Sequence, residues 1–248
     1  VLVTGYGLGA TAWGGFSRFA RVPAEWVVPI PPALTPRECM AYGTAGFTAA
    51  QCVQAIVRRS ITPELGPVVV TGATGGVGSL AVAILTKLGF RVTAVSGKVE
   101  KHAWLRELGA AEIVDRQEVN DTSTRPMLSE RWAAAVDTVG GNTLATLVRS
   151  CRHRAVVAAC GLVGGDQLPL TVYPFLLRGV TLAGIDSAQC PREPRLEIWR
   201  KLATDWRIDH LESLISEVTL DQLPAAIERI LAGKIVGRSL VRPIVGDS

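Results

Sequence analysis

The chain has 248 residues, of which 48% are hydrophobic and 19% are charged, and its formal net charge is +4. This length and composition are those of a globular α/β domain, with or without part of a second domain, and they exclude a disordered chain. Basic residues never form a run of five or more, so the sequence favours small anionic ligands over nucleic acid.

The five cysteines are odd in number, and no two of them stand in a CxxC spacing or beside a histidine that could share a metal ion. We therefore expect neither disulfides nor a zinc site. The sequence opens with no signal peptide and contains no apolar stretch long enough to span a membrane, so we expect a cytoplasmic protein. Because Val1 opens a strand-like run with no preceding turn, we expect a chain truncated at its start.

The first third of the chain changes character near Pro36. Residues 1–36 contain short β runs, such as 26–30, separated by loops rich in glycine and proline. Residues 37–58 are compatible with helix but are interrupted by Gly43-Thr44-Ala45-Gly46. We expect a domain boundary close to this change.

Beyond this point strands and helices alternate. Apolar runs predict six strands, at residues 68–71, 91–95, 111–114, 134–138, 155–159 and 180–184. Apolar residues at helical spacing predict helices over 75–88 and 100–108. The strand runs lack polar alternation, which is typical of a parallel sheet covered on both faces, so the predicted fold class is α/β with a doubly wound Rossmann sheet. A helix from Pro194 to about residue 205, a β run near Val218, a helix over 221–231 and a strand over 239–241 complete the chain.

A glycine-rich turn follows the first of these strands, where residues 72–78 read GATGGVG. In a strand-to-helix turn, glycines let a pyrophosphate reach backbone N–H groups at the start of the helix. Gly72, Gly75 and Gly78 stand in a G-x-x-G-x-x-G spacing that departs from the usual G-x-G-x-x-G. The alternative is a glycine-rich loop without a ligand, but the turn's place in a six-strand pattern favours a dinucleotide site.

The end of the second strand selects the cofactor. An acidic residue there would bind the ribose hydroxyls of NAD, but the sequence reads Ser96-Gly97-Lys98. Ser96 can donate a hydrogen bond and Lys98 carries a positive charge suited to the 2′-phosphate of NADPH. Arg116, just past the third strand, is a candidate for a second contact. The alternative is that Lys98 is only a solvated residue at a helix start.

Several segments resemble the medium-chain dehydrogenase/reductase superfamily, in its zinc-free quinone-oxidoreductase branch. They are WGGFSRFARVP (13–23), GTAGFTA (43–49), VVTGATGGVGS (69–79) and AVSGK (94–98). The segments ACGLVGG (159–165) and GIDS (184–187) make the chain similar to the acrylyl-CoA reductase subfamily. The resemblance covers essentially the whole chain and is more specific than the glycine turn alone.

The resemblance implies an NADPH-dependent reduction of acrylyl-CoA to propionyl-CoA, by hydride transfer to the β carbon and protonation at the α carbon. The thioester stabilises the developing charge, so no metal ion is expected. The resemblance also implies three parts: residues 1–36 as the last part of a GroES-like substrate domain, 37–220 as the NADPH-binding Rossmann domain, and 221–248 as a helix and strand that return to the substrate domain. Catalytic residues are not assigned, because they are expected in a missing N-terminal segment, which leaves the activity of this chain in question.

The resemblance also assigns cofactor contacts by position. Thr44 would approach the nicotinamide ribose or carboxamide. Thr74, Gly75, Gly76 and Val77 would line the pyrophosphate, and Ser96, Gly97 and Lys98 would hold the 2′-phosphate, with Arg116 beside them. Leu162, Leu176 and Ser187 would border the nicotinamide site, since two of them follow strands at the edge where such a sheet binds its ligand. Each of these loop residues could instead be a packing element.

The remaining chemical candidates are weaker. His102, His153 and His210 are isolated from any nucleophile, which favours surface or capping roles. Asp137 is interpreted as closing a strand end, and Cys160 as a small buried residue without a neighbouring base. Three functions stay open: a reductase of enoyl thioesters, a quinone or enone reductase of the same fold, and a non-catalytic NADPH-binding protein. The apolar edge strand at 180–185 predicts a homodimer, with no nucleic-acid or membrane partner.

Overall fold

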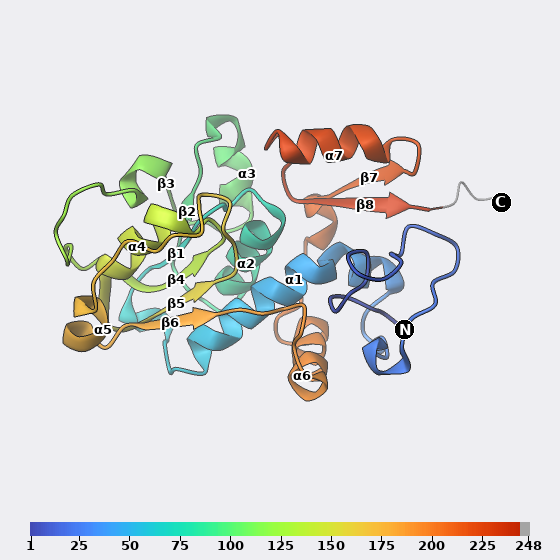
Figure 1. The fold of residues 1–248 in the computed structure, drawn as a ribbon, viewed down its shortest axis with the longest axis horizontal. Helices are drawn as coiled ribbons and strands as arrows, with labels where there is room; N and C mark the ends of the chain where they lie inside the picture. The colour runs from blue at the N-terminus through green and yellow to red at the C-terminus, as the bar shows by residue number, and fades with distance from the viewer. Residues whose placement is uncertain (244–248) are drawn as a thin grey trace. The chain divides into compact units, whose positions relative to one another are not determined.

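The computed structural model describes residues 1–243 (Figure 1). The helices are α1 Pro36–Val57, α2 Gly76–Lys87, α3 His102–Glu107, α4 Gly141–Arg149, α5 Tyr173–Arg178, α6 Arg192–Ala203 and α7 Leu223–Leu231. The strands are β1 Val68–Val70, β2 Val92–Val95, β3 Glu112–Val114, β4 Trp132–Asp137, β5 Cys151–Ala159, β6 Thr181–Gly184, β7 Ile215–Thr219 and β8 Arg238–Arg242. Within residues 1–243, no helix combines the length and the apolar character that crossing a membrane requires.

The chain divides into two compact units, residues 48–186 and residues 1–47 together with 187–248. The division falls after Phe47 and after Asp186, whereas the sequence places domain limits near residues 36 and 220. The three-part division, with a GroES-like segment over residues 1–36, stays a prediction.

The unit of residues 48–186 contains a six-stranded sheet in the order β3-β2-β1-β4-β5-β6, and all of its pairs are parallel. This order confirms the predicted doubly wound α/β fold. It arises because the strands are apolar runs: every residue of β1, β2 and β4 is buried, so both faces of the sheet must be covered. One face buries Val69, Ala135 and Val157 with Leu144, Leu147 and Val148 of α4.

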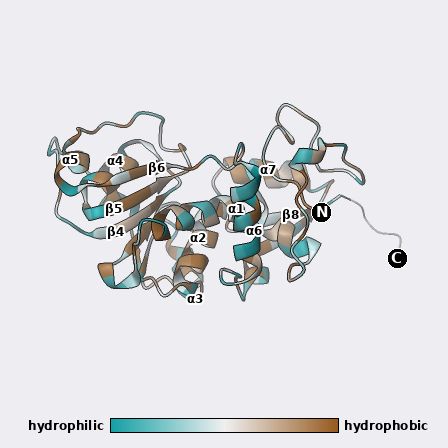
Figure 2. Cartoon of the chain, turned by 90° about the horizontal axis from the view of Figure 1, so that it is seen from below, coloured by the Kyte–Doolittle hydropathy of each residue, from teal (hydrophilic) through white to brown (hydrophobic). Residues whose placement is uncertain are grey.

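Hydropathy follows this arrangement. In Figure 2, α2 shows brown because residues 80–85 are all apolar, whereas α6 shows much teal. Eight residues of α2 are buried. The strand β6 lies at one edge of the sheet, as the sequence predicts for residues 180–185. The homodimer inferred from that edge stays a prediction.

Three sequence predictions in the sheet unit and beyond it require correction. The fifth strand begins at Cys151 and not at residue 155, because Cys151 pairs with Trp132 before the register shifts. The helix expected over 100–108 is a 3₁₀ turn over Val99–Lys101 followed by α3. Helix α6 begins before Pro194 and not after it. Proline is tolerated there because the N–H groups of the first turn make no hydrogen bond within the helix, so the N–H that proline lacks is not needed.

The unit of residues 1–47 and 187–248 contains fewer strands than expected. The β run expected over 26–30 forms only an isolated antiparallel bridge between Val28 and Leu2. The preceding residues Ala24–Trp26 take a 3₁₀ turn, and prolines at 29, 31 and 32 remove the backbone donors that would extend a ladder. The strands β7 and β8 pair in parallel as a separate sheet, and α7 begins at Leu223 instead of 221, with Pro224 in its first turn.

Helix α1 is kinked where the sequence interrupts the helical pattern. Gly43 has φ 51° and ψ −155°, which lie outside the helical region and suit glycine. The guanidinium of Arg238, in β8, donates from Nε to the carbonyl of Ala41 at 3.1 Å, and a Cβ on Gly43 would lie 2.8 Å from Nη2 of the same side chain. Burial lowers the pKa of Arg238. Arg238, which is half-buried, therefore binds the carbonyl of Ala41 beside the kink.

A fully buried arginine forms hydrogen bonds to the start of the chain and to the loop before α6. Arg195 is 1% exposed and lies over the rings of Tyr6 and Phe47. Its guanidinium donates to the carbonyls of Thr4, Ser187, Ala188 and Cys190 at 2.8–3.3 Å. In residues 1–243 no carboxylate lies within ion-pair distance of it, so backbone carbonyls and two aromatic faces solvate the charge.

We expect Arg195→Lys to destabilise the protein although it keeps the charge. An ammonium group cannot reproduce the planar fork of donors, and buried carbonyls left without a partner make the loss about 2–4 kcal/mol. Urea unfolding followed by circular dichroism measures the difference. Arg200→Lys, on the same helix at an exposed position, is the control and should leave the midpoint unchanged. Equal midpoints for both variants would contradict the role given to Arg195.

Candidate functional site

The turn between β1 and α2 is held in a close approach to the start of the β4–α4 loop. Gly72 has φ 56°, a conformation that favours glycine, and the amide of Gly75 donates to its carbonyl at 2.8 Å. A Cβ on Gly78 would lie 2.7 Å from the carbonyl carbon of Gly72 and 2.8 Å from Cα of Ala73. A side chain is therefore excluded at Gly72 and at Gly78, which lets α2 begin close to the end of β1.

The first turn of α2 has no side-chain cap, and the N-cap residue is Gly75. The first amides of a helix lack partners within the helix, and they carry the positive end of the helix dipole. Gly76, Val77 and Gly78 supply these amides in α2. This end of the helix is suited to an anion such as a pyrophosphate.

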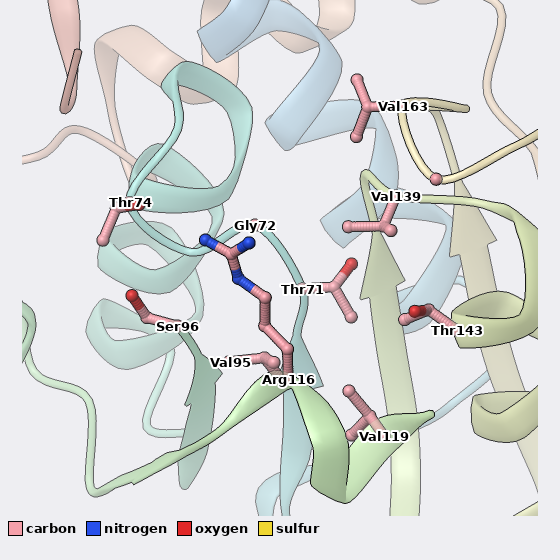
Figure 3. A pocket seen from close by; sticks show the side chains of 11 residues that line it. Thr71, Gly72, Thr74, Val95, Ser96, Arg116, Val119, Val139, Thr143 and Val163 are labelled. Carbon is pink, nitrogen blue, oxygen red and sulfur yellow. The ribbon is translucent and has the colours of Figure 1, made fainter. Parts of the chain in front are cut away.

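A pocket of about 330 Å³ opens beside this turn. Its lining comes from the carboxyl ends of β1, β2 and β4 and from the loops after β3 and β5; it comprises Thr71, Gly72, Thr74, Val95, Ser96, Arg116, Val119, Val139, Thr143, Val163 and Gly164. In Figure 3 the guanidinium of Arg116 extends toward Gly72, with Thr74 and Ser96 on the same side of the pocket. One cation and two hydroxyl groups thus converge beside the glycine turn.

Gly97 leaves room for this cation, because a Cβ there would lie 3.0 Å from Nε of Arg116. Ser96 is buried, and its Oγ accepts a hydrogen bond from the Lys98 amide at 3.1 Å. Lys98 is half-buried and does not belong to the pocket lining. The cation that lines the pocket is Arg116.

Asp137 ties the carboxyl ends of β1 and β4 together. Its carboxylate is fully buried and accepts from Thr71 Oγ1 and from the Gly140 amide, each at 2.7 Å. Thr138 adds two more bonds to Thr71, from its amide and from its hydroxyl, both at 3.0 Å. Burial raises the pKa of Asp137 above its ordinary value, and the hydrogen bonds from Thr71 and Gly140 offset only part of that rise. The contacts of Asp137 are those of a strand-end support.

The remaining predicted site residues are dispersed. Leu162 and Leu176 are 66% and 75% exposed, and neither lines the pocket. Thr44 and Ser187 belong to the other compact unit, where Thr44 is exposed just after the α1 kink and the carbonyl of Ser187 accepts from Arg195 at 3.3 Å. The structure thus brings together Thr74, Ser96 and Arg116 with the glycine turn, and leaves the other assignments as predictions.

Sequence reasoning missed several pocket residues, among them Thr71, Val139, Thr143 and Gly164. All of them follow or end strands of the sheet, or start a helix after one. Because the carboxyl ends of parallel strands meet at one edge, strand ends alone could have indicated them. Side-chain type gave no such signal.

The histidines and cysteines form no evident metal or nucleophile site. His153 pairs with Glu130 at 3.2 Å, whereas Nε2 of His102 is buried without a hydrogen-bond partner in residues 1–243. Across the same residues, no three His, Cys, Asp or Glu side chains cluster as metal ligands. Cys160 is a free thiol that donates to the carbonyl of Asp137 at 3.5 Å. The neighbouring free thiol of Cys52 lowers the pKa of Cys160, and this neighbour together with burial raises the pKa of Cys52.

Comparison with known proteins places this geometry in a family. The zinc-binding dehydrogenase family profile matches residues 76–206. Acrylyl-CoA reductase AcuI of Ruegeria pomeroyi is 50% identical over 241 residues, which are 97% of this chain and 73% of that protein. This chain therefore spans about three quarters of the relative's length.

Solved structures agree with the sequence match. The structure of Escherichia coli YhdH with bound NADPH superposes with a TM-score of 0.94 at 43% identity, covering 98% of this chain and 74% of that one. Bacillus subtilis YhfP with bound NAD has the same TM-score at 44% identity, covering 97% and 73%. The chain therefore belongs to the zinc-binding dehydrogenase family of the medium-chain dehydrogenase/reductase superfamily, in the group of oxidoreductases that includes acrylyl-CoA reductase AcuI.

Proposed function

We propose that this protein binds NADPH and reduces the activated C=C bond of an enoyl thioester, with acrylyl-CoA to propionyl-CoA as the reaction. The observation that carries the proposal is the pocket at the carboxyl ends of the strands, where an uncapped helix start meets Ser96 and Arg116. Its support from the relatives is the 50% identity to AcuI and the NADPH held by E. coli YhdH.

The residues of the pocket fit the dinucleotide. The turn would hold the pyrophosphate through Thr74, Gly75, Gly76 and Val77, since a Cβ at Gly72 or Gly78 would collide with neighbouring atoms and the first amides of α2 have no partner within the helix. Ser96, Gly97 and Arg116 would hold the 2′-phosphate, with Lys98 near it. Thr44, Leu162, Leu176 and Ser187 are proposed contacts of the nicotinamide half, from the resemblance alone.

The chemistry requires little of the side chains in the pocket. NADPH, when bound, supplies the hydride that the β carbon of the substrate accepts. The thioester carbonyl delocalises the charge that develops on the substrate, so the proposal needs no metal ion. The residues described above bind and orient; the donor of the proton to the α carbon is not assigned to any of them.

A second activity in the same class is reduction of a quinone or enone. It is favoured by the 44% identity to YhfP, a protein provisionally named a quinone oxidoreductase. A non-catalytic role in NADPH binding is the third function that the sequence leaves open. Substrate comparison separates the three.

The first test is therefore an assay of the protein with NADPH and, in parallel, acrylyl-CoA, crotonyl-CoA, an enone and a quinone. We expect oxidation of the nicotinamide to be fastest with acrylyl-CoA, measured as loss of its absorbance. Faster oxidation with the quinone would favour the second activity. Tight NADPH binding without oxidation by any of the four would contradict the reductase proposal.

A second test concerns the glycine turn. We expect Gly78→Ala to weaken NADPH binding by about ten-fold or more, because the added methyl group must displace the Gly72 carbonyl and with it the turn. Gly184→Ala is the control, since a Cβ on Gly184 meets nothing within 4 Å. Calorimetric titration with NADPH measures both. Unchanged affinity in Gly78→Ala would contradict the pyrophosphate assignment.

A third test separates the two cations near the 2′-phosphate. A charge-assisted hydrogen bond to phosphate contributes about 1.5–3 kcal/mol, so Arg116→Gln should raise the KM for NADPH by about ten-fold or more and leave that for NADH nearly unchanged. Because Lys98 does not line the pocket, we expect Lys98→Gln to have the smaller effect. Steady-state kinetics with both cofactors gives the comparison. Equal losses with NADPH and NADH in Arg116→Gln would refute the phosphate role.

A further inference from the structure

The strand β5 contains a bulge made of basic residues. Between the pairs Trp132–Cys151 and Ala134–Val156 the register advances by two residues on β4 and by five on β5. The extra length of β5 contains Arg152, His153 and Arg154. Bulges re-aim side chains and are common beside functional sites.

This bulge lines a second pocket, of about 470 Å³. The lining comprises Arg59, His153, Arg154, Leu177, Arg178, Gly179 and Thr181. Thr181 is the first residue of β6, and the bulge lies in the first half of β5, so the pocket is at the amino ends of the strands (Figure 1). The glycine turn lies at the carboxyl ends of the strands, so the two pockets lie at opposite ends of the strands.

The second pocket has an excess of positive charge. Glu130 is the acid at its border, where it pairs with Arg178 at 3.3 Å and with His153 at 3.2 Å. Arg59 and Arg154 have no ion-pair or hydrogen-bond partner for their guanidinium groups within residues 1–243. Two exposed arginines without a side-chain partner in the described residues thus lie on the wall of one open pocket.

The backbone of Arg154 has an unfavourable conformation. Arg154 has φ 61°, and Ser60, which follows Arg59, has φ 58°. Tyr6 is the other non-glycine residue with positive φ in the described part of the chain. Such conformations are unfavourable for ordinary residues and persist where the surrounding structure holds them, often at ligand sites. Of these three residues, Arg154 lines the pocket, and Ser60 adjoins the lining residue Arg59.

We propose that this pocket binds a small phosphate-bearing molecule, separate from the dinucleotide of the proposed function. Guanidinium groups present paired N–H donors that match phosphate oxygens, and Arg59 and Arg154 offer two such groups. Because Arg59 and Arg154 offer two separate guanidinium groups, the ligand class we infer is a molecule with two phosphate groups, such as a diphosphate. Arg178 and the hydroxyl of Thr181 complete the polar lining.

The test is calorimetric titration of inorganic pyrophosphate into protein saturated with NADP⁺, which occupies the first pocket. We expect one binding event in the natural protein. Arg154→Gly removes a guanidinium and also relieves the positive φ, so it should weaken pyrophosphate binding by at least ten-fold while leaving thermal stability unchanged or higher. Arg59→Gln should weaken binding similarly. Arg106→Gln, at an exposed position on α3, removes the same charge elsewhere and should leave binding unchanged.

Absence of binding in the natural protein would overturn the proposal, as would equal weakening in Arg106→Gln or citrate binding as tightly as pyrophosphate. Failure of NADP⁺ to bind would count against the proposed function alone. The pyrophosphate comparison between natural protein and Arg154→Gly would still decide the second site, because Arg154 lies at the opposite end of the strands from the glycine turn.

Discussion

Between β1 and α2 the chain turns so tightly that side chains are excluded from Gly72 and Gly78, and this steric constraint governs the rest of the site. Helix α2 starts directly after this turn, and its first amides have neither a partner within the helix nor a side-chain cap. Because Thr71 ends β1 at that point, its hydroxyl can reach Asp137, and through Asp137 and Thr138 the turn is tied to β4. The pocket therefore lies between the buried hydrogen bonds of Thr71, Asp137 and Thr138 and the backbone donors at the start of α2.

The sequence predicted the sheet because its strands are apolar on both faces. Every residue of Val68–Val70 and Val92–Val95 is buried, as expected for apolar runs in a sheet covered on both faces. Parallel strands also place their carboxyl ends at the same end of the sheet. The same reasoning located the glycine turn and Ser96. These features depend on neighbours in the sequence, which is why they could be predicted.

What sequence reasoning missed depends on residues distant in the chain. It ranked Lys98 above Arg116, since Lys98 adjoins Ser96, but only the folded loop after β3 shows that Arg116 lies over Gly97. It started the fifth strand at residue 155, because polar residues 152–154 conceal a strand that resumes beyond a bulge. The hydrogen bond from the Cys160 thiol to the Asp137 carbonyl likewise joins residues 23 positions apart, so the local sequence does not indicate it.

Arg195 has a further consequence for the behaviour of its unit in acid. Its partners are carbonyls and aromatic rings, none of which gains a proton as the pH falls, so acid does not weaken this joint. Exposed ion pairs of the same unit behave differently. Arg37 pairs with Glu217 and Arg207 pairs with Glu38. The pKa of Glu217 is lowered chiefly by Arg37, and that of Glu38 first by the Thr35 amide and then by Arg207, so the stability that these contacts add is present near neutrality and is lost as the pH falls. Acid should therefore weaken the surface ion pairs of this unit and leave the buried hydrogen bonds of Arg195 intact.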